Sequence, residues 1–328
     1  MKDNLPLISV VIPVKNGDAW LEKTIPAILG QQLQGGHEVI VIDSGSTDNT
    51  LRLLDNYPVR VHHLPPSAFN HGGTRNLGVS LARGKYVVMT VQDATPADEN
   101  WLNHLLAGFD DGNVAAVCGQ QIVPHDRDKN PIAWFRPVDP AGIKKYAYPT
   151  PAIFDALSPD QKRAVCRWDN VNAMYRKDVL EQLPFRKTEF AEDALWAADA
   201  LRAGYSLVYN TAARVCHYHY ETPEFTLRRS LAEYYHYYKI FGTIPPSPAG
   251  EWISLVRNSR VLLKEKTIGW REKWEWLRFN SRERKATRQS IRLFMDALAK
   301  GEGQLDRLHG QLCGTPPQAL KPGSVAGR

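Results

Sequence analysis

Polar and acidic side chains follow three apolar runs in the first hundred residues. The runs LISVVIPV (7–14), EVIVIDS (38–44) and KYVVMTV (85–91) predict strands buried on both faces. Ligands of open parallel sheets bind at the carboxyl ends of the strands. These ends carry Pro13, Lys15, Asn16, Asp43, Ser46, Gln92 and Asp93. Because a carboxylate accepts hydrogen bonds from a base N–H or a ribose hydroxyl, the three ends together predict a nucleotide pocket. For each residue alone, a turn or helix cap is the competing interpretation.

The segment FNHGGTRN (69–76) concentrates hydrogen-bond donors around two glycines. We expect a loop just before a helix, in which the glycines let the backbone approach a ligand closely. His71, Arg75 and Asn76 would face that ligand, since a guanidinium matches a phosphate with two parallel hydrogen bonds. No G-x-G-x-x-G follows the first strand and G-x-x-x-x-G-K-[ST] is absent, so a cation or a metal must neutralise any phosphate. The alternative is an ordinary loop with a surface arginine.

Two further groups are candidates for catalysis and metal binding. Glu192 and Asp193 open the strongly helical segment 191–204, where the helix dipole alone would favour carboxylates. An ionised aspartate in a cleft also serves as a general base toward a hydroxyl group. His217 and His219 end the predicted strand 205–220, and the two-residue period places only one of them on the functional side of the sheet. A packed, hydrogen-bonded histidine is the competing interpretation.

The elements that must position these groups alternate in the first half of the chain. Strands at 7–14, 38–44, 59–64 and 85–91 alternate with helices, which predicts right-handed βαβ units and a mostly parallel sheet flanked by helices. A further strand is expected at 114–124, and residues 125–165 are expected to be irregular. We predict a catalytic domain over 1–224, a helical extension over 225–315 and a loose tail over 316–328.

Composition limits the class and the expected location of the protein. Of 328 residues, 43% are hydrophobic, which is ordinary for a globular protein. The four cysteines lie far apart without a C-x-x-C pair, which disfavours a disulfide scaffold and indicates a reducing compartment. The N-terminus lacks the features of a signal peptide, and no run approaches ~18 apolar residues. We therefore expect a cytoplasmic protein.

The net charge of +6 is concentrated near the C-terminal end. Residues 251–300 hold 13 Lys or Arg against 6 Asp or Glu, a local excess of seven. Basic residues mixed with Trp, Tyr and Phe on helices are typical of segments that lie at a membrane surface. A solvated helical hairpin that packs its aromatic residues against the catalytic domain is the alternative. A nucleic-acid partner is disfavoured, because the carboxylates at the strand ends would repel phosphates and no recognised motif is present.

Seven stretches, in order, resemble the family 2 glycosyltransferases of GT-A fold, and especially the bacterial rhamnosyltransferase-like group. They are ISVVIPVKN, VIDSGSTDNT, FNHGGTRNLG, VQDATP, WDNVNAMYR, AEDALWAADALRAGY and VCHYHY, within about residues 7–220. The resemblance implies inverting transfer of a hexosyl or rhamnosyl group from a UDP- or dTDP-sugar to the hydroxyl of a glycan or lipid-linked glycan. Such transfer would serve the synthesis of a bacterial surface polysaccharide (O-antigen, capsule or exopolysaccharide), and would take place in the cytoplasm or at the inner face of the cell membrane.

The resemblance also implies roles for individual residues. Pro13, Lys15 and Asp43 would contact the base and ribose, with Asn16, Ser46, His71, Asn76 and Gln92 also on the donor side, and Arg75 would hold the diphosphate. Asp193 falls on the catalytic base, Asp93 on the metal-binding D-x-D motif, and His217 on a histidine that completes the metal shell. Trp168, Asp169, Asn170 and Glu192 are candidates for the acceptor side.

One position departs from the family pattern. Val91 replaces the first aspartate of D-x-D, so Asp93 is the only carboxylate at this strand end. A divalent metal, Mn²⁺ or Mg²⁺, would be held by Asp93, His217 and the donor's diphosphate, and an imidazole ligand suits Mn²⁺ better. The departure leaves two alternatives open: a metal-independent enzyme that uses Arg75 and His71, and a glycosyltransferase-like binding protein without activity. A nucleotidyltransferase also uses a parallel sheet and metal-binding carboxylates, but it would normally have a Gly-rich loop with Arg or Lys after the first strand, which VIPVKNGDAW fits poorly.

Overall fold

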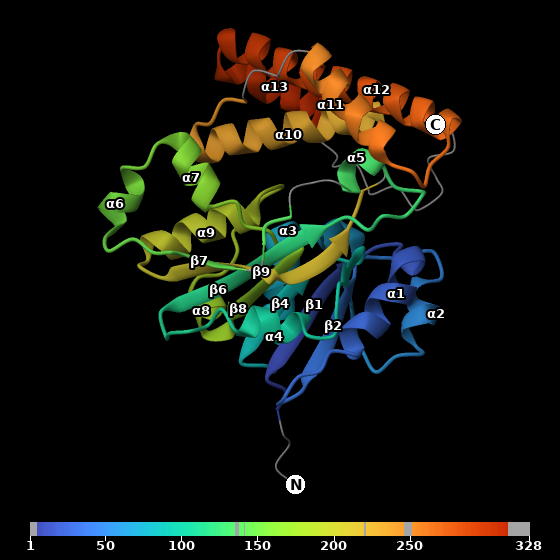
Figure 1. Ribbon diagram of the computed structural model, residues 1–328. Coiled ribbons are helices and arrows are strands. Elements are labelled where there is room, and N and C mark those ends of the chain that lie inside the picture. The colour runs from blue at the N-terminus through green and yellow to red at the C-terminus, as the bar shows by residue number, and fades with distance from the viewer. Residues whose placement is uncertain (1–4, 135–137, 141, 220, 246–250, 314–328) are drawn as a thin grey trace. The chain divides into compact units, whose positions relative to one another are not determined.

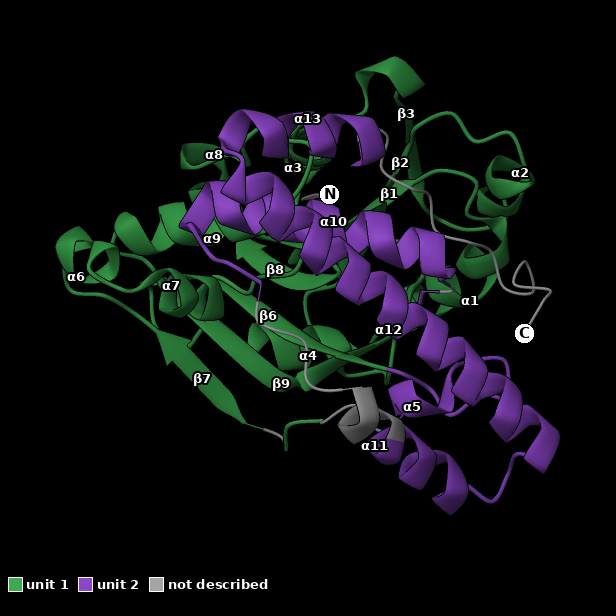
Figure 2. Ribbon diagram, turned by 90° about the horizontal axis from the view of Figure 1, so that it is seen from above, with its two compact units in different colours: residues 1–122, 138–217 green, residues 123–137, 218–328 purple. Residues whose placement is uncertain are grey.

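The computed structural model describes residues 5–134, 138–140, 142–219, 221–245 and 251–313. The chain forms two compact units, which Figure 2 shows in different colours. The first unit comprises residues 1–122 and 138–217, and the second comprises residues 123–137 and 218–328. The second unit thus begins earlier than the predicted extension at 225 and also includes a segment from the middle of the chain. The predicted tail, 316–328, lies outside the described residues.

The first unit is built on one sheet with helices packed around it (Figure 1). The strands are β1 (Ile8–Val14), β2 (His37–Asp43), β3 (Arg60–His63), β4 (Tyr86–Thr90), β5 (Ala94–Pro96), β6 (Val114–Ile122), β7 (Ile143–Tyr146), β8 (Asn172–Arg176) and β9 (Ser206–His217). The helices are α1 (Asp18–Leu29), α2 (Thr50–Leu54), α3 (His71–Leu81), α4 (Trp101–Leu106), α6 (Pro151–Asp155), α7 (Pro159–Val165), α8 (Lys177–Gln182) and α9 (Glu192–Arg202), with a short 3-10 helix at Pro66–Ala68.

The sheet confirms the predicted α/β class. Its order is β3-β2-β1-β4-β8-β6-β9-β5, and β7 also pairs with β9. The pairs β1–β2, β2–β3, β1–β4 and β6–β9 are parallel, whereas β8 runs antiparallel to both β4 and β6. The central strands are buried on both faces, as their continuous apolar runs predicted. The carboxyl ends of β1, β2, β4 and β6 therefore lie along one edge of the sheet.

Two predictions about local structure were wrong. The segment at 69–76 is not a loop, because α3 already begins at His71, where the Asn70 side chain accepts a hydrogen bond from the Gly73 N–H. Gly72 is needed for packing rather than for a turn, since a Cβ there would lie 2.0 Å from the Arg186 carbonyl oxygen. The region 125–165 is not irregular, because it contains β7, α6, α7 and the short helix α5 (Pro131–Trp134).

The second unit is helical, as the sequence predicted for its C-terminal part. Its helices are α5, α10 (Pro223–Phe241), α11 (Glu251–Lys264), α12 (Trp270–Ala299) and α13 (Glu302–Cys313). One apolar cluster joins α10, α12 and α13 around Leu231, Phe294 and Leu305, and another joins α5, α11 and α12 around Trp134, Leu262 and Trp276. None of the described helices is long and apolar enough to cross a membrane.

Candidate active site

The ends of β1, β2 and β4 are tied together by hydrogen bonds. The Gln92 side chain accepts from the Lys15 N–H at 3.0 Å and donates to the Lys15 carbonyl oxygen at 3.3 Å. The Asn16 N–H donates to the Ser46 hydroxyl at 2.8 Å, and the Asn16 side chain accepts from the Thr47 N–H at 2.8 Å. The structure thus brings these sequence-predicted residues together at one edge of the sheet. The side chains of Gln92 and Asn16 bind backbone groups of the loops there.

Asp43 is buried at the end of β2. Its carboxylate accepts hydrogen bonds from the Gly45 and Ser46 N–H groups at 3.1 and 3.2 Å, and His63 Nδ1 lies 3.6 Å away. Gly45 has a φ of +86°, which a glycine adopts without strain. Asp43 therefore shapes the turn that follows β2.

The predicted donor-side residues on α3 have different surroundings. Asn76 bonds both backbone groups of Phe185, donating to its carbonyl oxygen at 2.8 Å and accepting from its N–H at 3.0 Å. His71 is half-buried, and burial lowers its pKa despite the nearby Glu192 carboxylate. Arg75 Nη1 makes a buried ion pair with Glu192 Oε1 at 2.8 Å. Thus α3 delivers its only described buried cation to the start of α9, and Asn76 anchors the chain before α9.

Two carboxylates with opposite properties begin α9. Burial alone would raise the pKa of Glu192, but Arg75, His71 and a hydrogen bond from Asn170 outweigh it, and the pKa is lowered. Burial, and next the charges of Glu192 and Asp169, raise the pKa of Asp193 to about 8. Because neighbouring carboxyl groups with separated pKa values take different roles in catalysis, Asp193 is suited to exchange a proton near neutral pH.

The segment before β8 holds this pair in place. The Asn170 side chain donates to Glu192 at 3.1 Å, and its backbone N–H donates to Asp193 Oδ2 at 3.3 Å. The Tyr175 hydroxyl donates to Asn170 Oδ1 at 2.6 Å and accepts from the Trp168 indole at 2.8 Å. Trp168 is only 5% exposed, so in this structure it packs in the core. Asn170 is the residue of this segment that contacts both carboxylates.

Asp93 and His217 form a candidate metal site. Ala94 of β5 pairs with His217 at the end of β9, and this pairing places His217 Nε2 3.4 Å from Asp93 Oδ2. Both side chains are buried, and their ligand atoms lie within 4.8 Å of each other. A carboxylate oxygen and an imidazole nitrogen suit Mn²⁺. His219 follows His217 by two residues, and this short length of chain keeps His219 near the pair.

Sequence reasoning missed a residue that links this metal site to the segment before β8. Gln121, near the end of β6, faces His217 Nδ1 with its carbonyl oxygen at 2.7 Å and donates its amide hydrogen to Asp169 Oδ2. Asp169 Oδ1 accepts from the Val171 N–H at 2.8 Å. The same search of strand ends that selected Asp43 and Asp93 would have found Gln121 in VCGQQIVP.

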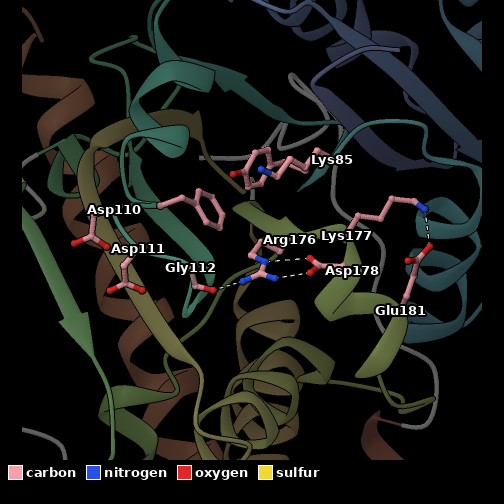
Figure 3. A pocket seen from close by; sticks show the side chains of 10 residues that line it. Lys85, Asp110, Asp111, Gly112, Arg176, Lys177, Asp178 and Glu181 are labelled. Atoms are coloured by element: carbon pink, nitrogen blue, oxygen red, sulfur yellow. Dashed lines mark hydrogen bonds and ion pairs between the residues drawn. The ribbon is translucent and has the colours of Figure 1, made fainter. Parts of the chain in front are cut away.

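A separate pocket of about 800 Å³ lies at the other edge of the sheet (Figure 3). It is lined by the start of β4 and the end of β8, where Tyr86 pairs with Arg176. Two ion pairs lie within its lining, Lys177 with Glu181 and Arg176 with Asp178, and the lining residues Asp110 and Asp111 pair with Lys145. The pocket therefore lies away from the strand ends that carry the predicted site.

Comparison with known proteins identifies the family of the chain. The profile of the family described as "Glycosyl transferase family 2" matches residues 9–183, just over half of the chain. The O-antigen chain rhamnosyltransferase WbaN of Salmonella anatum is 33% identical over 231 residues, 69% of this chain and 70% of that protein. RfbN of Salmonella typhimurium, another O-antigen chain rhamnosyltransferase, is 32% identical over 228 residues, 68% and 69% of the two chains.

A solved structure shows the same fold. The mannosyltransferase PcManGT from Pyrobaculum calidifontis, in complex with GDP-Man and Mn²⁺, aligns with a TM-score of 0.50 at 16% identity, covering 94% of this chain and 79% of that one. The family match and the relatives show that the protein is a glycosyltransferase, and its mixed α/β sheet is of GT-A type. The chain belongs to glycosyl transferase family 2.

Proposed function

We propose that the protein is an inverting glycosyltransferase that moves a rhamnosyl or other hexosyl group from a UDP- or dTDP-sugar to a glycan hydroxyl in surface polysaccharide synthesis. The observation that carries this proposal is the half-buried Asp193 carboxyl group at the start of α9, with a pKa raised to about 8. The names of WbaN and RfbN support the rhamnosyl group and an O-antigen product.

In the proposed mechanism, Asp193 accepts the proton of the acceptor hydroxyl as that oxygen attacks the anomeric carbon. The bond from this carbon to the diphosphate breaks in the same step, so the nucleoside diphosphate leaves and the anomeric configuration inverts. Glu192 stays ionised beside Arg75, and the backbone N–H of Asn170 orients the Asp193 carboxyl group. On the acceptor side we place Glu192, Asp169, Asn170 and Trp168.

For the donor, we propose that the loops after β1 and β2 hold the nucleoside. Pro13, Lys15 and Asp43 would meet the base and ribose, beside Asn16, Ser46 and Gln92, while His71, Arg75 and Asn76 would lie toward the diphosphate. Arg75 uses Nη1 for both Glu192 and the His71 carbonyl oxygen, so a phosphate oxygen would meet another nitrogen of the guanidinium.

We propose Asp93 and His217 as the ligands of a divalent cation, Mn²⁺ or Mg²⁺, with His219 as a further candidate. Such a cation, when bound, would neutralise charge on the departing diphosphate. The chemistry of the donor set supports this fit, because one carboxylate and one imidazole are buried within reach of each other.

A screen of nucleotide sugars tests the proposed donor. We expect a UDP- or dTDP-sugar, and dTDP-rhamnose above all, to raise the melting temperature, with a larger rise when Mn²⁺ is added. At a ligand concentration of about 100 Kd, mass action stabilises the folded protein by about 2.7 kcal/mol. GDP- and ADP-sugars are the matched controls. If no uridine or thymidine nucleotide sugar shifts the melting temperature, the proposed donor class is wrong.

We further propose that the second unit contacts the membrane that would carry a lipid-linked acceptor. Near the start of α12, Trp270 and Trp274 are 74% and 65% exposed. From Trp270 to Arg292 the exposed residues of α12 follow helical spacing and are mostly basic, which matches an anionic surface: Trp270, Arg271, Trp274, Arg278, Arg282, Lys285, Gln289 and Arg292. Exposed tryptophans beside basic residues favour the membrane interface over a purely solvated helix.

The membrane contact is tested by sedimentation with lipid vesicles. We expect the wild-type protein to bind vesicles containing phosphatidylglycerol more tightly than phosphatidylcholine vesicles, and added salt to weaken binding. The double substitution Trp270→Ser and Trp274→Ser should reduce binding at least about 10-fold, because it removes two exposed aromatic side chains that would insert into the membrane surface. Ile153→Ser, at a 48% exposed apolar residue of the first unit, is the matched control. Equal binding by the double variant would refute this surface.

A further inference from the structure

We propose that Gln121 is a positioning residue that fixes the ring tautomer of His217 and ties the metal site to Asp169. The bound cation is part of the proposed function, and to that extent the inference rests on it. The contacts of Gln121 do not depend on the proposed function. Gln121 lies between the two groups, with one end of its amide on each. Gln121 is not among the residues that the sequence predicted for the site.

The chemistry of the three groups determines which atom carries each hydrogen. Both oxygens of Asp169 accept hydrogen bonds, one from the Val171 N–H and one from Gln121, so the NH₂ end of the Gln121 amide faces Asp169. Its carbonyl oxygen must then face His217 Nδ1, at 2.7 Å. A carbonyl oxygen only accepts, so Nδ1 of His217 carries the hydrogen.

This hydrogen position leaves the other ring nitrogen as the ligand atom. A neutral imidazole protonated at Nδ1 has its lone pair at Nε2, and Nε2 faces Asp93 Oδ2 at 3.4 Å. A metal-binding histidine is commonly fixed in this way by an acceptor at its other nitrogen. Gln121 therefore presents His217 in the one neutral form that binds a cation on the Asp93 side.

The backbone around Gln121 is held firmly. Gln121 pairs with Val215 in the parallel β6–β9 ladder, and His217 ends β9 two residues later. The β6–β9 register shifts between Cys118 and Gln120, just before Gln121, and such irregularities re-aim the following side chains. Gly119 allows β6 and β9 to approach each other closely at this point, because a Cβ there would lie 2.2 Å from the Ala213 carbonyl oxygen.

The consequence for Asp169 is as specific as that for His217. The Asp169 charge helps to raise the pKa of Asp193. Gln121 holds Asp169 Oδ2 through its amide, so one side chain sets the position of a charge near the proposed base and the orientation of a metal ligand. Loss of Gln121 should therefore affect cation affinity first, while Asp193 keeps its own backbone hydrogen bonds.

The test compares Gln121→Leu with Gln120→Leu in the full-length protein. We expect Gln121→Leu to weaken Mn²⁺ binding, measured by the paramagnetic resonance of free Mn²⁺, by about 10–100-fold. Gln120, which is buried, is adjacent to the half-buried Gln121 in β6, and its described contacts do not include His217 or Asp169, so Gln120→Leu should leave Mn²⁺ affinity within about twofold. Gln121→Met, of similar shape, replaces Gln121→Leu if that variant does not fold.

A second readout does not depend on a bound metal. Nitrogen-15 spectra of the histidine rings, assigned with His217→Asn, should show His217 protonated at Nδ1 in the wild type and a mixture of tautomers in Gln121→Leu. The inference is overturned if Gln121→Leu changes neither the tautomer nor Mn²⁺ affinity, or if Gln120→Leu has the same effect. Failure of the proposed function gives a different result: no nucleotide sugar binds the wild type, whatever the His217 tautomer.

Discussion

Asp193→Asn is expected to reduce sugar transfer by about 10²–10⁴-fold while the protein stays folded. The substitution keeps the size of the side chain and one acceptor oxygen, which can take the place of Oδ1 and accept from the Ala194 N–H at 2.7 Å, while the longer bond from the Asn170 N–H to Oδ2, at 3.3 Å, is lost. It removes the only property that the mechanism needs, which is the capacity to take a proton from the acceptor hydroxyl. Release of nucleoside diphosphate at saturating donor and acceptor measures the effect.

The pH dependence gives a second signature of the same residue. A carboxyl group with a pKa of about 8 is mostly protonated at neutral pH, so kcat/KM should rise with pH and level off above that value. Because the unfolded chain releases this proton near the ordinary value of 3.8, the folded protein holds more protons between these two values and loses stability as the pH rises. Asp193→Asn removes this loss, so its melting temperature at about pH 9 should equal or exceed that of the wild type.

The control for Asp193 lies on the same helix. Asp199 of α9 pairs with Arg186 at the surface, and Asp199→Asn should change transfer by less than about twofold, because it touches neither Glu192 nor Asp193 among its described contacts. If Asp193→Asn retains more than about a tenth of the wild-type rate, Asp193 is not the general base. A pH profile that keeps its inflection near pH 8 in the Asn variant would assign that inflection to another group.

The separation of roles between Glu192 and Asp193 follows from what surrounds each carboxyl group. Glu192 has a cation at 2.8 Å and an amide donor at 3.1 Å, both buried with it. Asp193 has backbone donors but the negative charges of Glu192 and Asp169 beside it. Arg75 therefore stabilises one charge and leaves the next carboxyl group as the site that gains a proton most readily.

Strand positions were predictable because each buried strand leaves a continuous apolar run in the sequence. The run at 7–14 became β1 and the run at 85–91 became β4, with the polar residues at the expected ends. Strand β8 was not predicted, because NAMYR is a short stretch whose pairing with β4 and β6 depends on residues far away in the chain. Its antiparallel direction is the one departure from the regular βαβ pattern in the middle of the sheet.

Side-chain roles were harder to predict than side-chain positions. Gln92 lies at the strand end where the sequence placed it, whereas Asn76 lies inside α3. Their amides bond backbone groups of Lys15 and Phe185, which are 77 and 109 residues away. Nothing in the local sequence identifies such partners. Residues 69–76 were misread because Gly72 and Gly73 suggested a turn, whereas close packing of α3 against the chain near Arg186 requires Gly72 inside a helix.

Asp93→Asn is expected to lower cation affinity by at least about 10–100-fold and sugar transfer by about 10²-fold or more. The amide keeps the shape of the side chain but removes the negative charge, and Val91, where the family pattern has another aspartate, packs against the apolar core of the first unit. A site with two carboxylates would keep one after such a change. Here the change leaves His217 as the neighbouring described ligand, and a neutral imidazole alone does not compensate the charge of a divalent cation.

The comparison variant is Asp98→Asn, two residues beyond β5, where the carboxylate is partly exposed and lies 3.9 Å from His104. It should change Mn²⁺ affinity and transfer by less than about twofold, because surface ion pairs contribute little. The measurement is the transfer rate as a function of added Mn²⁺ after chelation with EDTA. An Asp93→Asn variant with the same Mn²⁺ dependence as the wild type would show that the cation binds elsewhere. If EDTA does not change transfer by the wild type but Asp93→Asn still loses transfer, the Asp93 carboxylate has a metal-independent role. The variant His217→Asn distinguishes these two results, because it should reproduce the effect of Asp93→Asn only if both side chains hold one cation.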